Sequence, residues 1–184
     1  MSDAVEPPDA ASSMSDSASC ELETVPSQVP LEDGSVHVDS LPDGFAYNSV
    51  PASQGPHHPE WLRWGVYEEP VPELNVVHNL EHGGITVQYG RDVLPETVAK
   101  VLEWYAEDTD AIIVAPHDGL GAEIALAGWT VENVEQAVEV VYSSSEGNVL
   151  HCDGFDERAF SDFRETYRGR APERIPLELM PAGS

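Results

Sequence analysis

Residues 78–84, His-Asn-Leu-Glu-His-Gly-Gly, combine two imidazoles and a carboxylate in one short stretch. On a helix, positions four residues apart share a face, so His78 and His82 could bind one metal ion together, with Glu81 beside them. In an extended chain the even spacing again places both imidazoles on one side. The valine pair before this stretch favours a strand, so both conformations remain open.

A third imidazole, His57, comes from an upstream loop that contains glycine and proline. Neutral imidazole is a common ligand of Zn and Cu. We therefore predict that His57, His78 and His82 bind a Cu or Zn ion through nitrogen. Glu81 is then the fourth ligand, or the partner that orients a histidine. The alternative is that these histidines are ordinary hydrogen-bonded residues. Two further histidines are reserve candidates: His37 and His58.

Three classes of function follow from these residues. The first is a metal-binding domain that handles or senses the ion. The second is a metal-dependent hydrolase or oxidase, which would keep an open coordination position on the same ion. The third is a non-catalytic interaction module with an exposed patch formed by Trp61, Trp64 and Tyr67. These aromatic residues could instead cover the core.

Other motifs have plainer explanations. His-x-x-Glu-His also spells the inverzincin protease signature, but the two glycines that follow end any helix, so a protease is not favoured. His117 and Asp118 could be a base and its orienting partner, although the following glycine favours a simple hairpin turn. His151 and Cys152 could be a ligand pair, but a buried thiol is favoured. The sequence has no phosphate-binding loop and no serine nucleophile elbow.

The chain is strongly acidic. Among 184 residues, 34 are acidic and 8 are basic, and the formal net charge is −26. Such a surface repels phosphate groups, which argues against nucleic acid and anionic membranes as partners. The acidic residues are spread along the chain and Lys100 is the only lysine. This composition is typical of proteins adapted to high salt, and a cation-handling surface is the alternative.

The sequence predicts a cytoplasmic protein with no membrane span. It has no run of about 18 apolar residues, and its first residues lack the basic and apolar regions of a signal peptide. There are two cysteines, Cys20 and Cys152. Two cysteines do not make a disulfide framework, and a bond between them is possible but not required.

The hydropathy pattern predicts a disordered acidic tail at residues 1–30 and a single domain at residues 31–184. The tail has few large apolar residues and cannot bury enough surface to order itself. Alternation around a Pro-Asp-Gly turn predicts a short hairpin within residues 36–47, followed by an ordered proline-rich loop at residues 48–74. The later elements are expected at residues 85–89 (strand), 95–107 (helix), 111–115 and 123–129 (a hairpin), 130–141 (helix), 149–152 (strand) and 160–167 (helix).

This order of elements predicts an α+β fold. We expect a two-layer sandwich in which a mixed or antiparallel sheet carries helices on one face. A ferredoxin-like arrangement is favoured, and a thioredoxin-like arrangement is the alternative because it shares the helix-strand-strand-helix segment. The Cys-x-x-Cys pair of a thioredoxin enzyme is absent from the sequence.

A series of motifs resembles an uncharacterised prokaryotic family, domain of unknown function 3105. It comprises Tyr47, Ser53-Gln54-Gly55-Pro56-His57, Gly65-Val66-Tyr67, His78-Asn79-Leu80-Glu81-His82-Gly83 and Tyr89. The His-x-Leu-Glu-His-Gly core is specific, and the resemblance covers about residues 35–175. The chain departs from the family's double proline, since it has Val50-Pro51-Ala52. The resemblance implies no reaction, and many members resemble membrane-anchored proteins, where this chain has an acidic tail.

Overall fold

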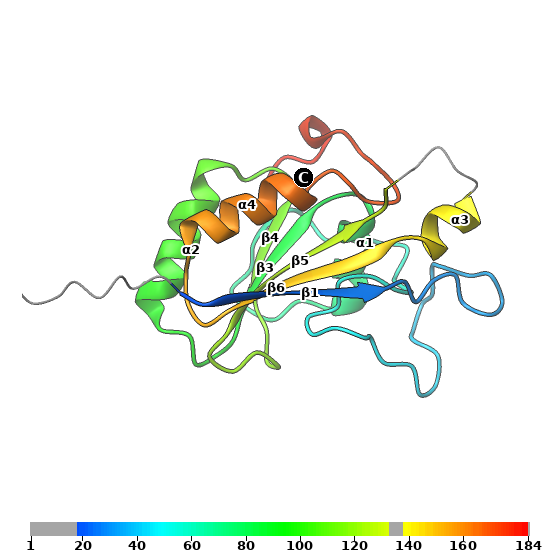
Figure 1. Ribbon diagram of the computed structural model, residues 1–184, viewed down its shortest axis with the longest axis horizontal. Helices are drawn as coiled ribbons and strands as arrows, with labels where there is room; N and C mark the ends of the chain where they lie inside the picture. The colour runs from blue at the N-terminus through cyan, green and yellow to red at the C-terminus, as the bar shows by residue number, and fades with distance from the viewer. Residues whose placement is uncertain (1–17, 133–137, 184) are drawn as a thin grey trace, which may run out of the picture.

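The computed structural model describes residues 18–132 and 138–183 of the chain. Within these ranges a six-stranded mixed sheet carries four α-helices and one short 3-10 helix, η1 (Figure 1). The strands are β1 (Cys20–Pro26), β2 (Gly65–Val66), β3 (Ile85–Tyr89), β4 (Ile112–Pro116), β5 (Ile124–Thr130) and β6 (Glu146–Cys152). The helices are α1 (Glu73–Glu81), α2 (Pro95–Glu107), α3 (Val138–Ser143), α4 (Glu157–Tyr167) and η1 (Leu177–Leu179).

The strands lie in the order β1-β6-β5-β3-β4-β2. β4 is parallel to both β3 and β2, whereas β5 is antiparallel to β3 and β6, and β1 is antiparallel to β6. The central strands are buried on both faces, which explains the continuous apolar run of β4. This sheet is the platform on which both layers of the molecule pack.

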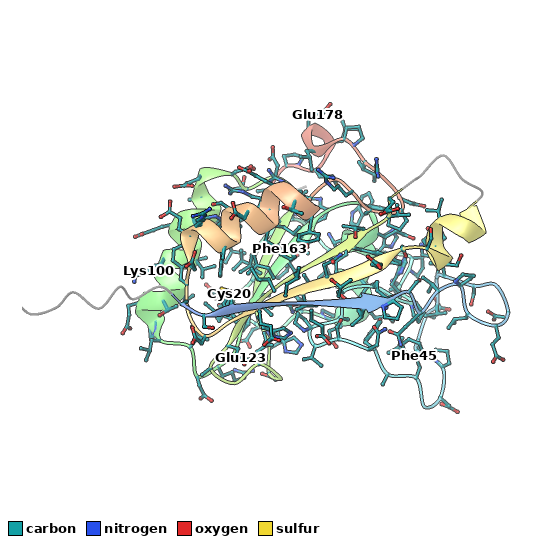
Figure 2. All side chains as sticks on the ribbon, in the orientation of Figure 1. Cys20, Phe45, Lys100, Glu123, Phe163 and Glu178 are labelled. Atoms are coloured by element: carbon teal, nitrogen blue, oxygen red, sulfur yellow. A yellow bond between two sulfur atoms is a disulfide. The ribbon has the colours of Figure 1, made fainter. Side chains whose placement is uncertain are left out.

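The two faces of the sheet carry different layers. Ile124 and Leu126 of β5 face α2 and α4, where Trp104 and Phe163 complete the larger core. Phe163 points from α4 towards the sheet (Figure 2). The alternate β5 residues face a second core that includes Leu80 of α1. α1 therefore lies on the opposite side of the sheet from α2 and α4 (Figure 1).

The predicted α+β class and mixed sheet are confirmed. The placement of helices on one face holds for α2 and α4, while α1 and the long loop before it cover the other face. The favoured ferredoxin-like arrangement is wrong. Such folds split the strand-helix-strand unit by inserting another strand, whereas β3 and β4 are hydrogen-bonded neighbours here. A parallel β3-α2-β4 unit followed by the antiparallel β5 and β6 and by α4 agrees with the thioredoxin-like alternative.

The N-terminal segment is a correction to the sequence prediction. Part of the predicted disordered tail, Cys20–Pro26, forms edge strand β1 and pairs with all seven residues of β6. Most β1 side chains are exposed, so hydropathy carried no signal for it and main-chain hydrogen bonds hold it. The predicted domain boundary at residue 31 is therefore too late, and residues 1–17 lie outside the described residues.

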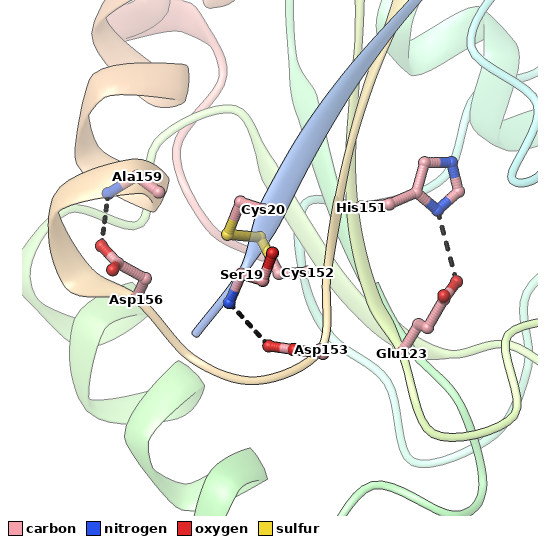
Figure 3. The surroundings of a disulfide bond; sticks show 8 residues. All are labelled: Ser19, Cys20, Glu123, His151, Cys152, Asp153, Asp156 and Ala159. Atoms are coloured by element: carbon pink, nitrogen blue, oxygen red, sulfur yellow. Dashed lines mark hydrogen bonds and ion pairs between the residues drawn. A yellow bond between two sulfur atoms is a disulfide. The ribbon is translucent and has the colours of Figure 1, made fainter. Parts of the chain in front are cut away.

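A disulfide between Cys20 and Cys152 joins β1 to β6 (Figure 3). The two cysteines are direct cross-strand partners, and their Cα atoms are 4.1 Å apart. Beyond them, the backbone N–H of Ser19 donates to Asp153 Oδ1 at 2.7 Å. Because Cys152 is in a disulfide, the favoured buried thiol is a correction to the sequence prediction, and the alternative His151-Cys152 pair does not offer a thiolate ligand.

Three local predictions also differ from the structure. Residues 36–47 form no hairpin; their one ladder contact is a parallel bridge between His37 and His57. β4 and β5 do not pair with each other, because β3 lies between them. The helix predicted at residues 130–141 begins later, because Thr130 ends β5 and α3 begins at Val138; residues 133–137 lie outside the described residues.

The proline-rich loop is ordered, as predicted. Trp64 is buried and packs with Ile113 and Met180, and Tyr67 is partly buried against the same cluster. Trp61, in contrast, is 46 % exposed. No helix within the described ranges has the length and apolarity that a membrane span requires.

Candidate metal centre

Helix α1 carries both a packing face and a polar face. Val77 and Leu80 are fully buried against the sheet. The neighbouring positions His78 and Glu81 turn away from that core towards the loop that precedes the helix. The helix begins after Pro72 and ends where Gly83 adopts a φ of +96°. This left-handed conformation favours glycine, as expected of the residue that follows a helix cap.

The second glycine of the His-Gly-Gly motif has a different cause. A Cβ atom on Gly84 would lie 2.3 Å from the Trp64 ring, so that the indole can pack only against a bare backbone. The two glycines are therefore required by the fold: Gly83 ends α1, and Gly84 leaves room for the Trp64 ring.

Polar residues of α1 hold the loop in place. The buried Asn79 accepts a hydrogen bond from the Leu62 backbone N–H at 2.9 Å and donates to the Leu62 carbonyl at 2.8 Å. Asn75 donates to the carbonyl of Glu60 at 2.7 Å. The backbone N–H of His58 donates to the Leu74 carbonyl at 2.9 Å. These bonds fix residues 58–62 against the helix and so position the adjacent His57.

His37 reaches the same place through a short ladder. The His57 backbone N–H donates to the Val36 carbonyl at 3.1 Å, and the Val38 N–H donates to the His57 carbonyl at 2.8 Å. This bridge brings the rings of His37 and His57 to a centroid distance of 4.7 Å.

Four side chains converge on one point. The Nε2 atoms of His57 and His37 lie 3.0 and 3.5 Å from Oε2 of Glu81. The Nε2 atom of His78 lies 3.7 Å from the same oxygen. Ligand atoms about 2.1 Å from a tetrahedral ion are about 3.4 Å from one another, so these separations suit a single ion. Four residues each offer one potential ligand atom, and these atoms all lie within 4.8 Å of one another: His37, His57, His78 and Glu81.

The backbone fixes the orientation of two of these rings. His57 Nδ1 lies 2.8 Å from the Gly55 carbonyl, and His78 Nδ1 lies 2.7 Å from the His58 carbonyl. A carbonyl oxygen can only accept, so both Nδ1 atoms carry the proton. In a neutral imidazole this leaves the lone pair on Nε2, the atom that faces the cluster.

The carboxylate is anionic in spite of its burial. Glu81 is fully buried, which by itself raises its pKa. The hydrogen bond and charge of His57, together with the hydroxyl of Tyr142, outweigh that effect and lower the pKa to about 2. Tyr142 donates its hydroxyl hydrogen to Oε1 of Glu81, so Oε2 is the atom turned to the histidines.

His82 lies beside this group rather than within it. Its Nε2 is 3.0 Å from His78 Nε2 and 3.3 Å from Glu173 Oε2. A second group of potential ligands contains Glu81, His82 and Glu173. Burial and the neighbouring His78 lower the pKa of His82 to about 4, and burial also lowers the pKa of His78. Both rings are therefore neutral at pH 7.

The predicted ligands are thus brought together only in part. His57, His78 and Glu81 converge, the reserve residue His37 joins them, and His82 belongs to the adjoining group. The other reserve residue, His58, contributes its carbonyl, while its ring nitrogen accepts from the Glu60 N–H at 3.0 Å.

Two residues of the site had no local signal in the sequence. Tyr142 and Glu173 lie 61 and 92 positions from Glu81 along the chain. They meet it only because α3 and the C-terminal segment fold back on α1.

The His117-Asp118 pair has a structural role. His117 Nδ1 accepts from the Gly119 N–H at 3.0 Å, so its Nε2 donates to Glu73 Oε1 at 3.2 Å. His117 therefore joins the end of β4 to the start of α1. Asp118 pairs with Arg91 instead of orienting the histidine.

Comparison with known proteins gives a family but no activity. Neither a search of curated proteins nor a search of solved structures found a match. A family model described as "Protein of unknown function (DUF3105)" matches residues 39–177. This range contains His57, the whole of α1 and Glu173, whereas His37 and β1 precede it. The match covers most of the chain and confirms the resemblance seen in its motifs: the chain belongs to the DUF3105 family of proteins of unknown function.

Proposed function

We propose that this chain binds a divalent transition metal ion, Zn or Cu, on the loop-covered face of its sheet. Imidazole suits both metals, and one carboxylate beside several imidazoles is a common ligand set. The ligand atoms are Nε2 of His37, His57 and His78 and Oε2 of Glu81.

The observation that carries this proposal is the orientation of His57. Its Nδ1 hydrogen is bound to the Gly55 carbonyl. Its Nε2 lies 3.0 Å from Oε2 of Glu81, so this nitrogen either carries a second proton or turns a lone pair towards that oxygen. Two acceptors at this distance need a cation between them. A proton can serve for one ring, but protonating several rings would place like charges side by side in a buried cluster. One metal ion satisfies all the lone pairs at once.

The number of ligands favours metal binding over catalysis. A structural or carrier site is usually closed by four protein ligands, whereas a catalytic site keeps one position for water. Four ligand atoms are available to a single ion here. A hydrolase or oxidase remains the alternative proposal, and it requires His37, the one exposed member at 43 %, to leave a position open.

An interaction module built on the aromatic loop has weaker support. Trp64 is buried in the core, and Trp61 lies edge-on to His82 with ring centroids 4.1 Å apart. The three aromatic residues therefore do not form one continuous exposed patch.

The test is elemental analysis of the full chain, purified without a histidine tag or chelator and in high salt. We expect at least one Zn or Cu ion per chain in the wild type and loss of that ion in His57→Gln. His151→Gln is the matched control, because His151 lies on β6 away from the cluster, and it should keep the metal.

A second variant, His37→Gln, covers the possibility that His57→Gln does not fold, since His37 is exposed. The proposal is wrong if the wild type holds no Zn or Cu after reconstitution. It is also wrong if His57→Gln, folded by circular dichroism, keeps the same metal content.

A further inference from the structure

The C-terminal segment is attached to the end of α1 by its backbone. The N–H of Glu173 donates to the Glu81 carbonyl at 3.0 Å, and the N–H of Ile175 donates to the His82 carbonyl at 3.3 Å. The N–H of Gly169 donates to the Gly83 carbonyl at 2.7 Å. These bonds place the Glu173 carboxylate beside the helix end without any contribution from its own side chain.

His82 faces that carboxylate from the buried side. It is only 4 % exposed, and its Nε2 lies 3.3 Å from Glu173 Oε2. Its other ring nitrogen, Nδ1, is buried without a hydrogen-bond partner among the described residues. A buried ring nitrogen without a partner is costly, and a neutral imidazole binds a cation through whichever nitrogen carries no hydrogen.

We propose that Glu81, His82 and Glu173 form a second cation position that adjoins the first. The chain would then hold two divalent transition metal ions with Glu81 as their shared ligand. This inference rests on the proposed function, because the buried ion and the second ion share that carboxylate. One potential ligand atom from each of the three residues lies within 4.8 Å of the others.

The ligand atoms separate into two groups rather than one. The histidines of the first group are absent from the second, and His82 and Glu173 are absent from the first; only Glu81 belongs to both. His78 and His82 link the groups through their Nε2 atoms, 3.0 Å apart.

The two positions differ in their access to solvent. His57 and Glu81 are fully buried, whereas the Glu173 side chain is 49 % exposed. The second position also has one ligand fewer. Its ion is therefore bound more weakly and exchanges first, while the ion held by the four-residue group is retained.

The test is calorimetric titration of the metal-free full chain with ZnCl2, in high salt at pH 7.5. We expect two ions per wild-type chain, bound with different affinities. Glu173→Gln should lose the weaker event and keep the tighter one. Glu178→Gln is the matched control, because this exposed residue of η1 lies in the same segment (Figure 2), and it should keep both events.

The outcomes distinguish this inference from the proposed function. One ion per wild-type chain overturns the two-ion inference. If Glu173→Gln keeps that ion, the first position stands; if Glu173→Gln loses it, the ligand set of the proposed function is wrong as well. No binding by the wild type overturns both. Two ions in Glu173→Gln overturn the assignment of Glu173.

Discussion

At the scale of single residues, the site depends on protonation states set by burial. Desolvation disfavours the charged form of an imidazole, so the pKa values of His78 and His82 fall below 6.5. Both residues are then neutral over a wider pH range than exposed histidines, and their nitrogens remain available to a metal. Glu81 stays ionised over the same range, because its pKa is about 2.

The pH dependence of metal binding follows from these values. A protonated imidazole cannot bind metal, and burial lowers the pKa of the ligand His78, so this ligand stays available to zinc at a lower pH than an exposed histidine. We expect zinc content, measured by equilibrium dialysis, to stay constant from pH 8 to pH 6 and to fall between pH 6 and pH 4. Loss of half the zinc near pH 6.5, as for exposed histidines, would contradict this account.

Tyr142 supports the carboxylate from behind. Replacing it with Phe leaves Oε1 of the buried Glu81 without its hydroxyl donor. An unsatisfied buried acceptor costs about 1–3 kcal/mol, and loss of a ligand's supporting hydrogen bond typically weakens metal affinity about 10- to 100-fold. Tyr142→Phe should show both effects in urea unfolding and zinc titration. Tyr89→Phe, at the end of β3, is the control; equal behaviour of the two variants would argue against the role of Tyr142.

At the scale of elements, α1 and the preceding loop form one unit. Asn79 makes two hydrogen bonds to the Leu62 backbone and is fully buried. Asn79→Ala should lower the free energy of unfolding by about 2–3 kcal/mol, since a buried donor and acceptor lose their partners. Asn75→Ala, which removes one exposed hydrogen bond, should cost less than about 1 kcal/mol.

The loop should also loosen in Asn79→Ala. Trp61 is held between the loop and His82, so its fluorescence should become easier to quench with acrylamide. Equal free energies of unfolding and unchanged quenching in the two Asn variants would show that the hydrogen bonds of Asn79 to Leu62 are unimportant for holding the loop.

The elements that the sequence predicts are those whose burial follows a simple period. Helices α2 and α4 have apolar stripes, and β3 and β4 are continuous buried runs, so each was found near its true position. β1 was missed because its side chains are mostly exposed. The pairing of β4 was also wrong, since a local turn suggested a hairpin while non-local contacts place β3 beside it.

The residues of the site, too, could be predicted from the sequence only where they lie close together along the chain. The spacing of His78 and Glu81 on α1 is visible in the sequence, because both lie within one helical turn. The contribution of Glu173 is not visible, because main-chain hydrogen bonds between distant segments create it. His82 was expected beside His78 and is there, but the helix end turns it towards Glu173.

At the scale of the whole molecule, the disulfide joins the edge strand to the rest of the sheet. It closes a loop with a sequence separation of 132 residues, and cross-links of this kind typically stabilise a fold by about 2–5 kcal/mol. Cys20→Ser with Cys152→Ser should lower the free energy of unfolding by a similar amount. The measurement is denaturant unfolding of the oxidised wild type and the double variant; coincident curves would contradict this role.

The disulfide also bears on where the protein works. Such bonds persist mainly in oxidising compartments, so this pairing and the cytoplasmic location expected from the sequence lead to different predictions. Alkylation of intact cells, followed by mass measurement, separates them. No modified cysteine indicates an oxidising compartment, and two modified cysteines indicate a reducing one.

The central claim is that one ion joins His37, His57, His78 and Glu81. The most direct measurement is anomalous diffraction from crystals of the metal-loaded protein, recorded on both sides of the Zn or Cu absorption edge. We predict an anomalous peak about 2 Å from Nε2 of the three histidines and from Oε2 of Glu81. Loaded crystals with no peak at this position, and histidines bonded only to Glu81 and to one another, would contradict the account.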